Sequence, residues 1–259
     1  MTTIAQAFTK AHQEHRAALI GYLPAGFPSV AGAIDCITAM VEGGVDIIEI
    51  GLPYSDPLMD GITIQEAVQQ SLENGTKIAD VIDTAGQVSK LGVATLIMSY
   101  WNPIERYGVD RFSSELKSAG GVGVITPDLT PEEAHDWVQA TDAHEIDRVF
   151  LVALSSTDER LATVAAATTG FVYAGAVMGV TGARTSLGDA VREVVTRTRE
   201  YTELPIAVGL GVSTPEQAHE IAQFADGVIV GSAFINAINS GGPDAARELA
   251  QKLRAGVVR

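Results

Sequence analysis

The chain has 259 residues, of which 46% are apolar, and its 32 Asp and Glu against 17 Lys and Arg give a net charge of −15. This composition excludes a disordered chain and argues against binding to a nucleic-acid backbone, which needs Lys and Arg to displace counterions. One cysteine excludes an internal disulfide framework and the cysteine-rich zinc patterns, and since there is neither an apolar run of roughly 18 residues nor a signal-peptide pattern, we expect a soluble cytoplasmic protein.

Short runs rich in Val, Ile and Leu alternate with longer segments of helical pattern along the whole chain. Such near-continuous apolar runs are typical of parallel strands that are buried on both faces. We expect eight strands, at Ala18–Leu23, Asp46–Gly51, Thr95–Tyr100, Gly123–Thr126, Arg148–Leu154, Gly170–Ala174, Pro205–Gly209 and Gly227–Val230. Helices are expected between them, among others at Val30–Glu42, Thr63–Asn74, Lys77–Lys90, Pro131–Ala140, Asp158–Ala167, Leu187–Tyr201 and Pro215–Gln223.

Two of these helices have clear start signals. Thr214 and Thr130 each place a hydroxyl directly before a proline, which is favoured in the first turn of a helix. Eight strand–helix units in about 250 residues predict an α/β fold, a (β/α)8 TIM barrel that forms a single domain over residues 1–259. A doubly wound open sheet is the competing architecture, but it usually has fewer strands, and no G-x-G-x-x-G motif follows the first strand.

In such a barrel the active site lies at the C-terminal ends of the strands. No histidine or lysine is expected there, because all of them fall in predicted helices or loops: His12, His15, His135, His144, His219, Lys10, Lys77, Lys90, Lys117 and Lys252. We therefore expect no histidine catalysis, no histidine-bound metal and no Schiff-base lysine. Cys36 lies in an apolar helical stretch and is interpreted as part of the core.

Carboxylates remain as the candidates for catalysis. Glu49 lies inside an apolar strand close to its C-terminal end, where burial would raise its pKa toward the range of a general acid and base. The alternative is a buried structural Glu paired with a cation from elsewhere in the fold. In the following loop, Asp60 is either a second acceptor that faces the pocket or a loop residue, and Asp56 before Pro57 is equally well a turn former.

Glycine clusters end the last three strand–helix units, at Met178–Arg184, Gly209–Gly211 and Gly231–Ala233. Glycine lets backbone N–H groups approach an anion closely, and a helix N-terminus adds a favourable dipole. Because phosphate sites recur after strands seven and eight of this fold, the clusters favour phosphate binding over simple tight turns.

At these residues the sequence resembles the tryptophan synthase alpha subunit family over nearly its whole length. The segments that carry the resemblance are Gly21–Gly26, Glu49–Pro57, Asp60–Gly61 with Ile64–Gln65, Asn102–Pro103, Pro127–Leu129, Gly179–Gly182 and Gly231–Ala233. The run from Ser55-Asp56-Pro57 to Asp60-Gly61 is highly specific, whereas the glycine clusters alone are not.

The resemblance implies that the chain cleaves indole-3-glycerol phosphate to indole and glyceraldehyde 3-phosphate. Indole would pass to a beta subunit that makes tryptophan with pyridoxal phosphate, in an alpha2-beta2 tetramer, and this chain itself would hold no cofactor and no metal. The implied catalytic residues are Glu49 and Asp60. The implied substrate-binding residues are Tyr22, Tyr173, Thr181, Gly182, Leu210, Gly211, Gly231 and Ser232.

Several residues depart from the common pattern of the family, namely Phe27, Ile62, Thr130, Ala176 and Leu210. Ile62 replaces the usual proline after Asp-Gly, which predicts a less rigid loop. Two other functions stay open: a stand-alone lyase that releases free indole, and a regulatory subunit that mainly activates a beta partner. Other phosphate-binding barrels fit the glycine clusters but do not explain Glu49 together with Pro53–Asp60.

Overall fold

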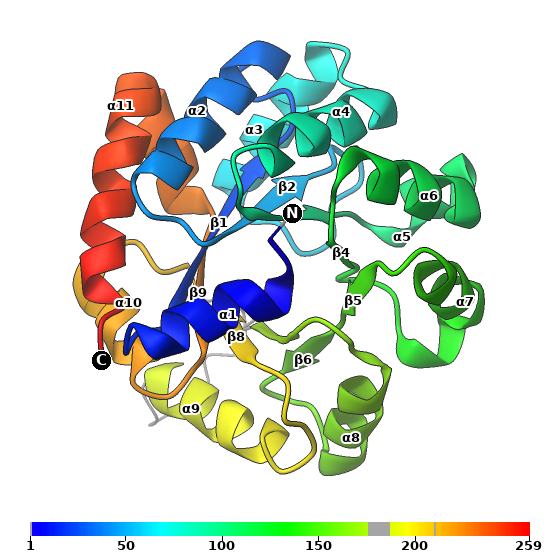
Figure 1. Ribbon diagram of the computed structural model, residues 1–259, viewed down its shortest axis with the longest axis vertical. Coiled ribbons are helices and arrows are strands. Elements are labelled where there is room, and N and C mark those ends of the chain that lie inside the picture. The colour runs from blue at the N-terminus through cyan, green and yellow to red at the C-terminus, as the bar shows by residue number, and fades with distance from the viewer. Residues whose placement is uncertain (1, 176–186, 210) are drawn as a thin grey trace.

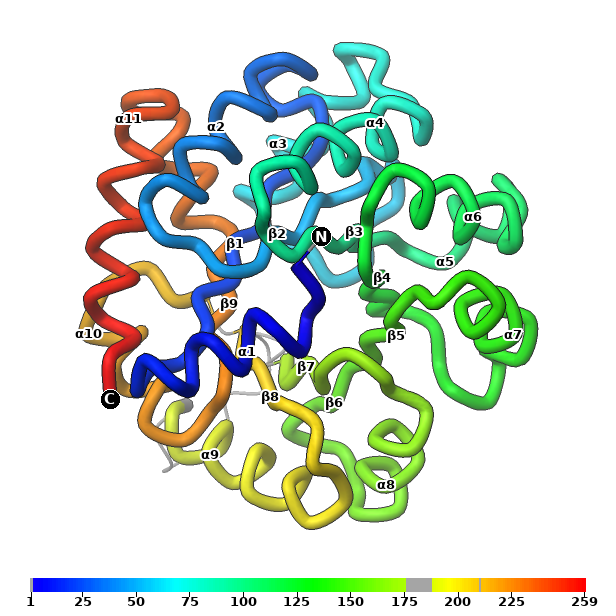
Figure 2. Tube along the Cα trace, in the orientation of Figure 1, coloured from blue at the N-terminus to red at the C-terminus, as the bar shows by residue number. Residues whose placement is uncertain are grey.

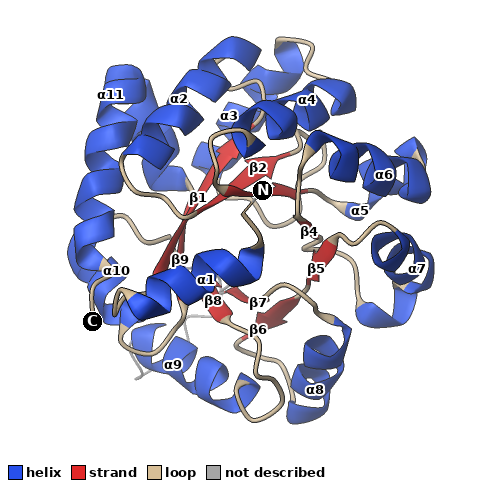
Figure 3. Ribbon diagram, in the orientation of Figure 1, coloured by secondary structure: helices blue, strands red, loops and turns tan. Residues whose placement is uncertain are grey.

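The computed structural model describes residues 2–175, 187–209 and 211–259. Parallel strands surround a central interior, and helices form a ring outside them (Figures 1 and 3). The strands are β1 Ala18–Pro24, β2 Ile47–Gly51, β3 Ala94–Met98, β4 Gly123–Ile125, β5 Asp147–Val149, β6 Leu151–Ala153, β7 Val172–Gly175, β8 Ile206–Gly209 and β9 Gly227–Val230. Their order, β5-β4-β3-β2-β1-β9-β8-β7-β6, gives a nearly closed barrel and confirms the predicted (β/α)8 fold.

Helices connect successive strands, except β5 and β6, and a helix follows the last strand, as the tube in Figure 2 traces. They are α1 Ile4–Gln13, α2 Val30–Glu42, α3 Ile62–Glu73, α4 Ile78–Ser89, α5 Trp101–Tyr107, α6 Val109–Ala119, the 3-10 turn η1 Pro131–Glu133, α7 His135–Ala143, α8 Asp158–Ala167, α9 Leu187–Thr198, α10 Pro215–Ala222 and α11 Ser232–Gly256. All strand neighbours that pair do so in parallel, so their C-terminal ends share one end of the barrel.

The predicted strand Arg148–Leu154 is wrong in one detail, since it is two short strands divided at Phe150. β5 pairs with β4, and β6 pairs with β7. The N–H of Tyr173 donates to the Phe150 carbonyl at 3.1 Å, which continues the contact across the division. The run therefore turns from one neighbour to the other as it completes the barrel, and this local bend separates one predicted strand into two.

The two predicted helix starts have different outcomes. The Thr214 hydroxyl accepts the N–H of Gln217 at 3.3 Å, with Pro215 as the first helical residue of α10, as predicted. Thr130 instead begins only the turn η1 and makes no side-chain cap, and α7 begins later, at His135. The predicted helix Pro131–Ala140 is therefore wrong over its first turn, because a proline and two acidic residues there form a 3-10 turn.

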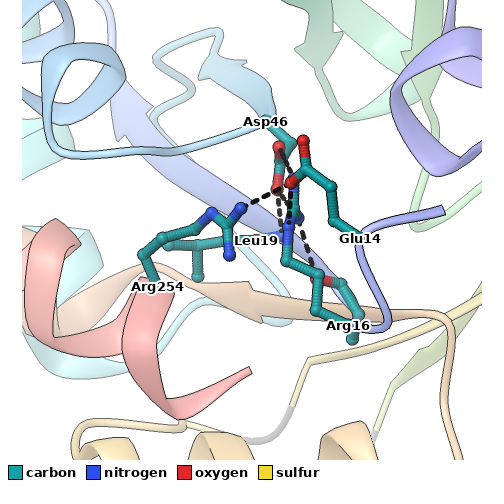
Figure 4. A network of polar contacts seen from close by, with 6 residues as sticks. Glu14, Arg16, Leu19, Asp46 and Arg254 are labelled. Carbon is teal, nitrogen blue, oxygen red and sulfur yellow. Dashed lines mark hydrogen bonds and ion pairs between the residues drawn. The ribbon is translucent and has the colours of Figure 1, made fainter. Parts of the chain in front are cut away.

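The N-terminal end of the barrel is covered by α1, which crosses its opening in Figure 1. Ile4 and Phe8 of this helix are buried and pack with the inward-facing residues of the strands. Beside it, the buried Arg16 guanidinium binds the Asp46 carboxylate with two hydrogen bonds of 2.5 and 2.7 Å and also binds Glu14 (Figure 4). This network fixes the closed end, and the opposite end is left for loops.

Candidate active site

Glu49 points into the barrel interior because side chains alternate along β2. Ile47 packs in the cluster inside the barrel, whereas Ile48 and Ile50 pack in the outer cluster between strands and helices. Glu49 shares the face of Ile47 and lies two residues from the C-terminal end of the strand. It is 0% exposed. The sequence prediction of a buried acid at this strand end is thereby confirmed.

The carboxyl group of Glu49 has no hydrogen-bond partner for either oxygen among the described residues. Burial alone raises its pKa to about 8. The structural alternative, a Glu paired with a cation from another element, thus finds no support in the described part of the chain. A buried acid without a protein partner that holds its proton near neutral pH is a typical candidate for proton transfer.

Asp60 lies in the loop between β2 and α3 and is held from two sides. Its carbonyl accepts the Gln65 side-chain amide at 2.7 Å, and the N–H of the preceding Met59 donates to the Tyr100 hydroxyl at 2.9 Å. Burial raises the pKa of the Asp60 carboxyl, and a hydrogen bond from Tyr100 counteracts that rise. The backbone on both sides of the Asp60 carboxyl group is therefore held in place although the loop is partly exposed.

Asp56 differs from Asp60 in its surroundings. It is exposed, and its carboxylate accepts the hydroxyl of the adjacent Ser55 at 2.6 Å. Such a local hydrogen bond is typical of a turn residue. Of the two loop carboxylates, Asp60 is the one whose charge acts on the barrel interior.

Two tyrosines are affected by the charges of both carboxyl groups, Glu49 and Asp60. The pKa of Tyr22 is raised well above its ordinary value by burial, and next by the charges of Asp60 and Glu49. The pKa of Tyr173 is raised in the same way, by burial and then by Glu49 and Asp60. Because both phenols respond to both carboxyl groups, the four side chains lie in one region at the C-terminal end of the barrel.

The two phenol groups fit against glycines at the strand ends. The Tyr22 hydroxyl lies where a side chain on Gly51 would be, and the Tyr173 hydroxyl lies in the same way against Gly209. A Cβ on Gly231 would approach the Tyr22 ring to 3.2 Å. Gly209 and Gly231 therefore make room for aromatic rings, a role that differs from the phosphate contact predicted from their clusters.

The predicted phosphate residues are only partly within the described chain. Thr181, Gly182 and Leu210, like the departure Ala176, lie outside the described residues. Gly211 has a φ of +68°, and a Cβ at this position would meet no atom of the described residues within 4 Å. Gly231 directly precedes α11, which begins at Ser232. Since the first N–H groups of a helix lack partners within the helix, the start of α11 is suited to bind an anion.

Other residue types lie away from this end. Cys36 is buried in α2, where burial raises its pKa to about 11, as expected of a core residue. His12 lies on α1 at the closed end of the barrel, and His219 lies on α10. In the part of the chain that the structure describes, no three His, Cys, Asp or Glu side chains gather in a way that could hold a metal ion. No helix among the same residues is long and apolar enough to cross a membrane.

Three residues of the site were not singled out from the sequence. Tyr100 follows β3 and contacts the Asp60 loop, while the half-buried Met98 and Leu151, like Tyr173, pack against the inner cluster. Part of the signal was available, because Met98 and Tyr100 lie at the end of a predicted strand, whereas Leu151 lies in the middle of one and begins β6 in the structure. Tyr100 in particular is the last residue of the predicted strand Thr95–Tyr100.

Comparison with known proteins adds an independent finding. Residues 8–257 match the family model described as tryptophan synthase alpha chain. The tryptophan synthase alpha chain of Acidothermus cellulolyticus is 53% identical, with 100% of this chain and 98% of that protein covered. That of Mycobacteroides abscessus is 52% identical, with 99% and 97% covered.

Solved structures agree with these matches. The structure of Mycobacterium tuberculosis tryptophan synthase in space group F222 has a chain that is 48% identical, with a TM-score of 0.94 and 100% of both chains covered. A tryptophan synthase subunit alpha from Legionella pneumophila is 29% identical, with a TM-score of 0.91 and 99% and 98% covered. The match of family model, sequence and fold extends over nearly the whole chain, and this chain therefore belongs to the tryptophan synthase alpha chain family.

Proposed function

We propose that Glu49 and Asp60 together catalyse the reaction of this family in this chain, the cleavage of indole-3-glycerol phosphate into indole and glyceraldehyde 3-phosphate. One observation carries the proposal. The buried Glu49 carboxyl has no hydrogen-bond partner among the described residues and keeps its proton to about pH 8, and Glu49 and Asp60 both raise the pKa of the same two tyrosines, Tyr22 and Tyr173. A single group that gives and takes a proton near neutral pH is what this cleavage needs.

The first step is a proton transfer to the indole ring. Glu49 donates its proton to ring carbon C3, which leaves positive charge on the ring nitrogen. The Asp60 carboxylate accepts the hydrogen bond of that N–H and stabilises the charge as it develops. The protonated ring then serves as the electron sink for breaking the carbon–carbon bond.

The second step returns the proton to the enzyme. Glu49, now ionised, removes the proton of the glycerol hydroxyl next to the bond that breaks. The oxygen forms a carbonyl, the carbon–carbon bond breaks, and its electron pair restores the aromatic ring as indole. Glu49 ends the cycle protonated, so the proton count balances and one residue serves as acid and then as base.

For substrate binding we propose two regions. Tyr22 and Tyr173 would contact the indole and glycerol parts, beside the apolar Met98 and Leu151. The phosphate would be bound by backbone N–H groups at Thr181-Gly182, Leu210-Gly211 and Gly231-Ser232. The location of Gly231 and Ser232 at the start of α11 supports the last of these, since helix N-termini favour anions.

An alpha chain of this family works with a beta subunit, to which the pyridoxal phosphate step belongs. We propose an alpha2-beta2 tetramer in the cytoplasm, with residues 1–259 as a single domain and no cofactor in this chain. The loop that carries Asp60 supports a partner contact, because Leu58 is 79% and Ile62 75% exposed. Exposed apolar side chains on one loop are typical of a protein interface.

The test is cleavage of indole-3-glycerol phosphate by the purified chain, alone and with a beta subunit. Glu49→Gln keeps the shape of the side chain and removes the proton, so we expect turnover to fall by about 10²- to 10⁴-fold. Glu248→Gln, at an exposed position on α11, is the matched control and should keep full activity. Turnover of Glu49→Gln at the control rate would contradict the proposal.

The same assay separates the alternatives. A stand-alone lyase would cleave at its full rate without the partner. A regulatory subunit would stimulate tryptophan formation by the beta subunit while both Glu49→Gln and the unchanged chain cleave nothing.

A further inference from the structure

Tyr100 lies near the Asp60 carboxyl and lowers its pKa against the effect of burial, and it comes from the end of a different strand. Tyr100 follows β3 and is 5% exposed. Its hydroxyl accepts the N–H of Met59, the residue before Asp60, at 2.9 Å. The same side chain thus binds the loop backbone next to Asp60 and lowers the pKa of the Asp60 carboxyl.

The direction of these bonds follows from what a phenol can do. A phenol oxygen has two acceptor sites and one proton. The Met59 N–H occupies one acceptor site, so the phenol proton is left to donate, and the lowered pKa of Asp60 indicates its carboxylate as the acceptor. Hydrogen bonds to a charged acceptor are shorter and stronger than neutral ones.

Tyr100 itself is fixed by its neighbours. Its ring lies 5.5 Å from the ring of Tyr54, whose hydroxyl accepts the Asn102 side-chain amide at 3.2 Å. The next residue, Trp101, donates its backbone N–H to the Asp128 carboxylate at 2.8 Å. The hydroxyl is therefore presented to the loop by a rigid strand end, which is how a positioning group must be held.

We propose that Tyr100 is a positioning residue for the reaction, whose hydroxyl fixes both the backbone and the carboxylate of the Asp60 loop in the geometry that accepts the indole N–H. The inference rests on the proposed role of Asp60. Without this hydroxyl the loop remains attached through Gln65, but the Asp60 carboxyl loses the contact that favours its ionised form.

The test is Tyr100→Phe in the full chain, assayed with saturating beta subunit. We expect kcat to fall by about 10- to 100-fold with little change in KM, since a charge-assisted hydrogen bond is lost that matters in the transition state. Tyr54→Phe is the matched control: it loses the same hydroxyl from a ring that packs at a tilt against Tyr100, and it should keep kcat.

A second readout follows the charge of Asp60. Because the Tyr100 bond lowers the pKa of Asp60, its loss should move the acid limb of the kcat/KM profile to higher pH. The groups around the phenol are Asp60, Asp128 and Tyr22, and the latter two are unchanged in the variant. NMR titration of ¹³C-labelled aspartate should show the same upward shift without any turnover, and it therefore serves even where activity is too low to measure.

The outcomes separate the two proposals. Asp60→Asn with full activity would overturn the role of Asp60 itself. An inactive Asp60→Asn together with a Tyr100→Phe variant that keeps kcat and an unshifted Asp60 titration would overturn the positioning role alone. Equal loss in Tyr100→Phe and Tyr54→Phe would also overturn it, by showing that the ring cluster acts only through stability.

Discussion

The hydroxyl of Tyr22 occupies the space that any side chain on Gly51 would need. The two residues lie on the paired strands β1 and β2. Tyr22 is aligned with Glu49, which lies two residues before Gly51. A glycine at the end of β2 is thus required by an aromatic ring from the neighbouring strand, and through that ring it affects the surroundings of Glu49.

Gly51→Ala should therefore destabilise the protein and disturb the site. Forcing a methyl group into this packed contact is expected to cost about 1–3 kcal/mol in the free energy of unfolding, measured by urea denaturation. Gly86→Ala on α4 is the control, because its Cβ would meet nothing closer than 3.4 Å. If both variants unfold at the same urea concentration, the contact with Tyr22 does not restrict residue 51.

The raised pKa of Glu49 predicts how stability depends on pH. In the unfolded chain Glu49 loses its proton near the ordinary value of 4.5, but in the folded chain it keeps the proton to about pH 8. The unfolded state therefore binds fewer protons across this window, and stability falls as pH rises from about 4.5 to about 8, by up to about 1.4 kcal/mol per pH unit.

Glu49→Gln should remove this contribution and become more stable than the unchanged protein toward pH 8, while the two are similar near pH 4. The measurement is the unfolding free energy of both proteins at several pH values. The raised carboxyls Asp60 and Asp128 are common to both proteins and cancel in the difference. If the difference in unfolding free energy between the two proteins does not change with pH, Glu49 ionises normally in the folded chain.

Phosphate binding should depend on the backbone at Gly211 more than on the hydroxyl of Ser232. Gly211→Val introduces a side chain at a φ of +68°, where a branched residue is strained, so the backbone N–H groups are displaced and affinity should fall more than about tenfold. Ser232→Ala keeps those N–H groups and should lower affinity less than about threefold.

Calorimetric titration with glycerol phosphate compares the two variants. Gly92→Val, at a φ of +79° with equally open surroundings but remote in sequence from the predicted phosphate segments, controls for backbone strain alone. Equal affinities for Gly211→Val and Ser232→Ala would contradict a backbone phosphate site.

Ile62→Pro should rigidify the Asp60 loop without a clash. Ile62 is the first residue of α3 and 75% exposed, and Gly61 before it has φ −71° and ψ 162°, a conformation that a following proline prefers. We expect a gain of about 0.4–1 kcal/mol in unfolding free energy and higher activity of the isolated chain. Activation by the beta subunit should shrink, because less of the loop ordering is left to the partner.

Steady-state cleavage is measured for both proteins with and without saturating beta subunit. The ratio of the two rates is the activation by the partner. An unchanged ratio in folded Ile62→Pro would mean that the mobility of this position is not what the partner corrects.

The sequence was informative where a regular strand pattern determined the result. The apolar run around Glu49 predicted its burial near a strand end, and the structure adds its direction, since Ile47 packs in the inner cluster and Ile48 and Ile50 pack in the outer one. The choice between Asp56 and Asp60 was not accessible, because it depends on Tyr100, which lies 41 residues beyond Met59 in the chain. Likewise, nothing local in Gly209 or Gly231 distinguishes room for an aromatic ring from room for a phosphate.

The bend at Phe150 has a consequence for how this protein can associate. β5 and β6 occupy the two ends of the strand order, but they are halves of one run, and the carbonyl of Arg148 also accepts the N–H of Thr169 at 3.0 Å. In the described chain the barrel thus presents no long free strand edge onto which another polypeptide could add a strand. Recognition has to use side chains on loops and helices, which makes partner choice a matter of surface chemistry that can change by substitution while the barrel stays the same.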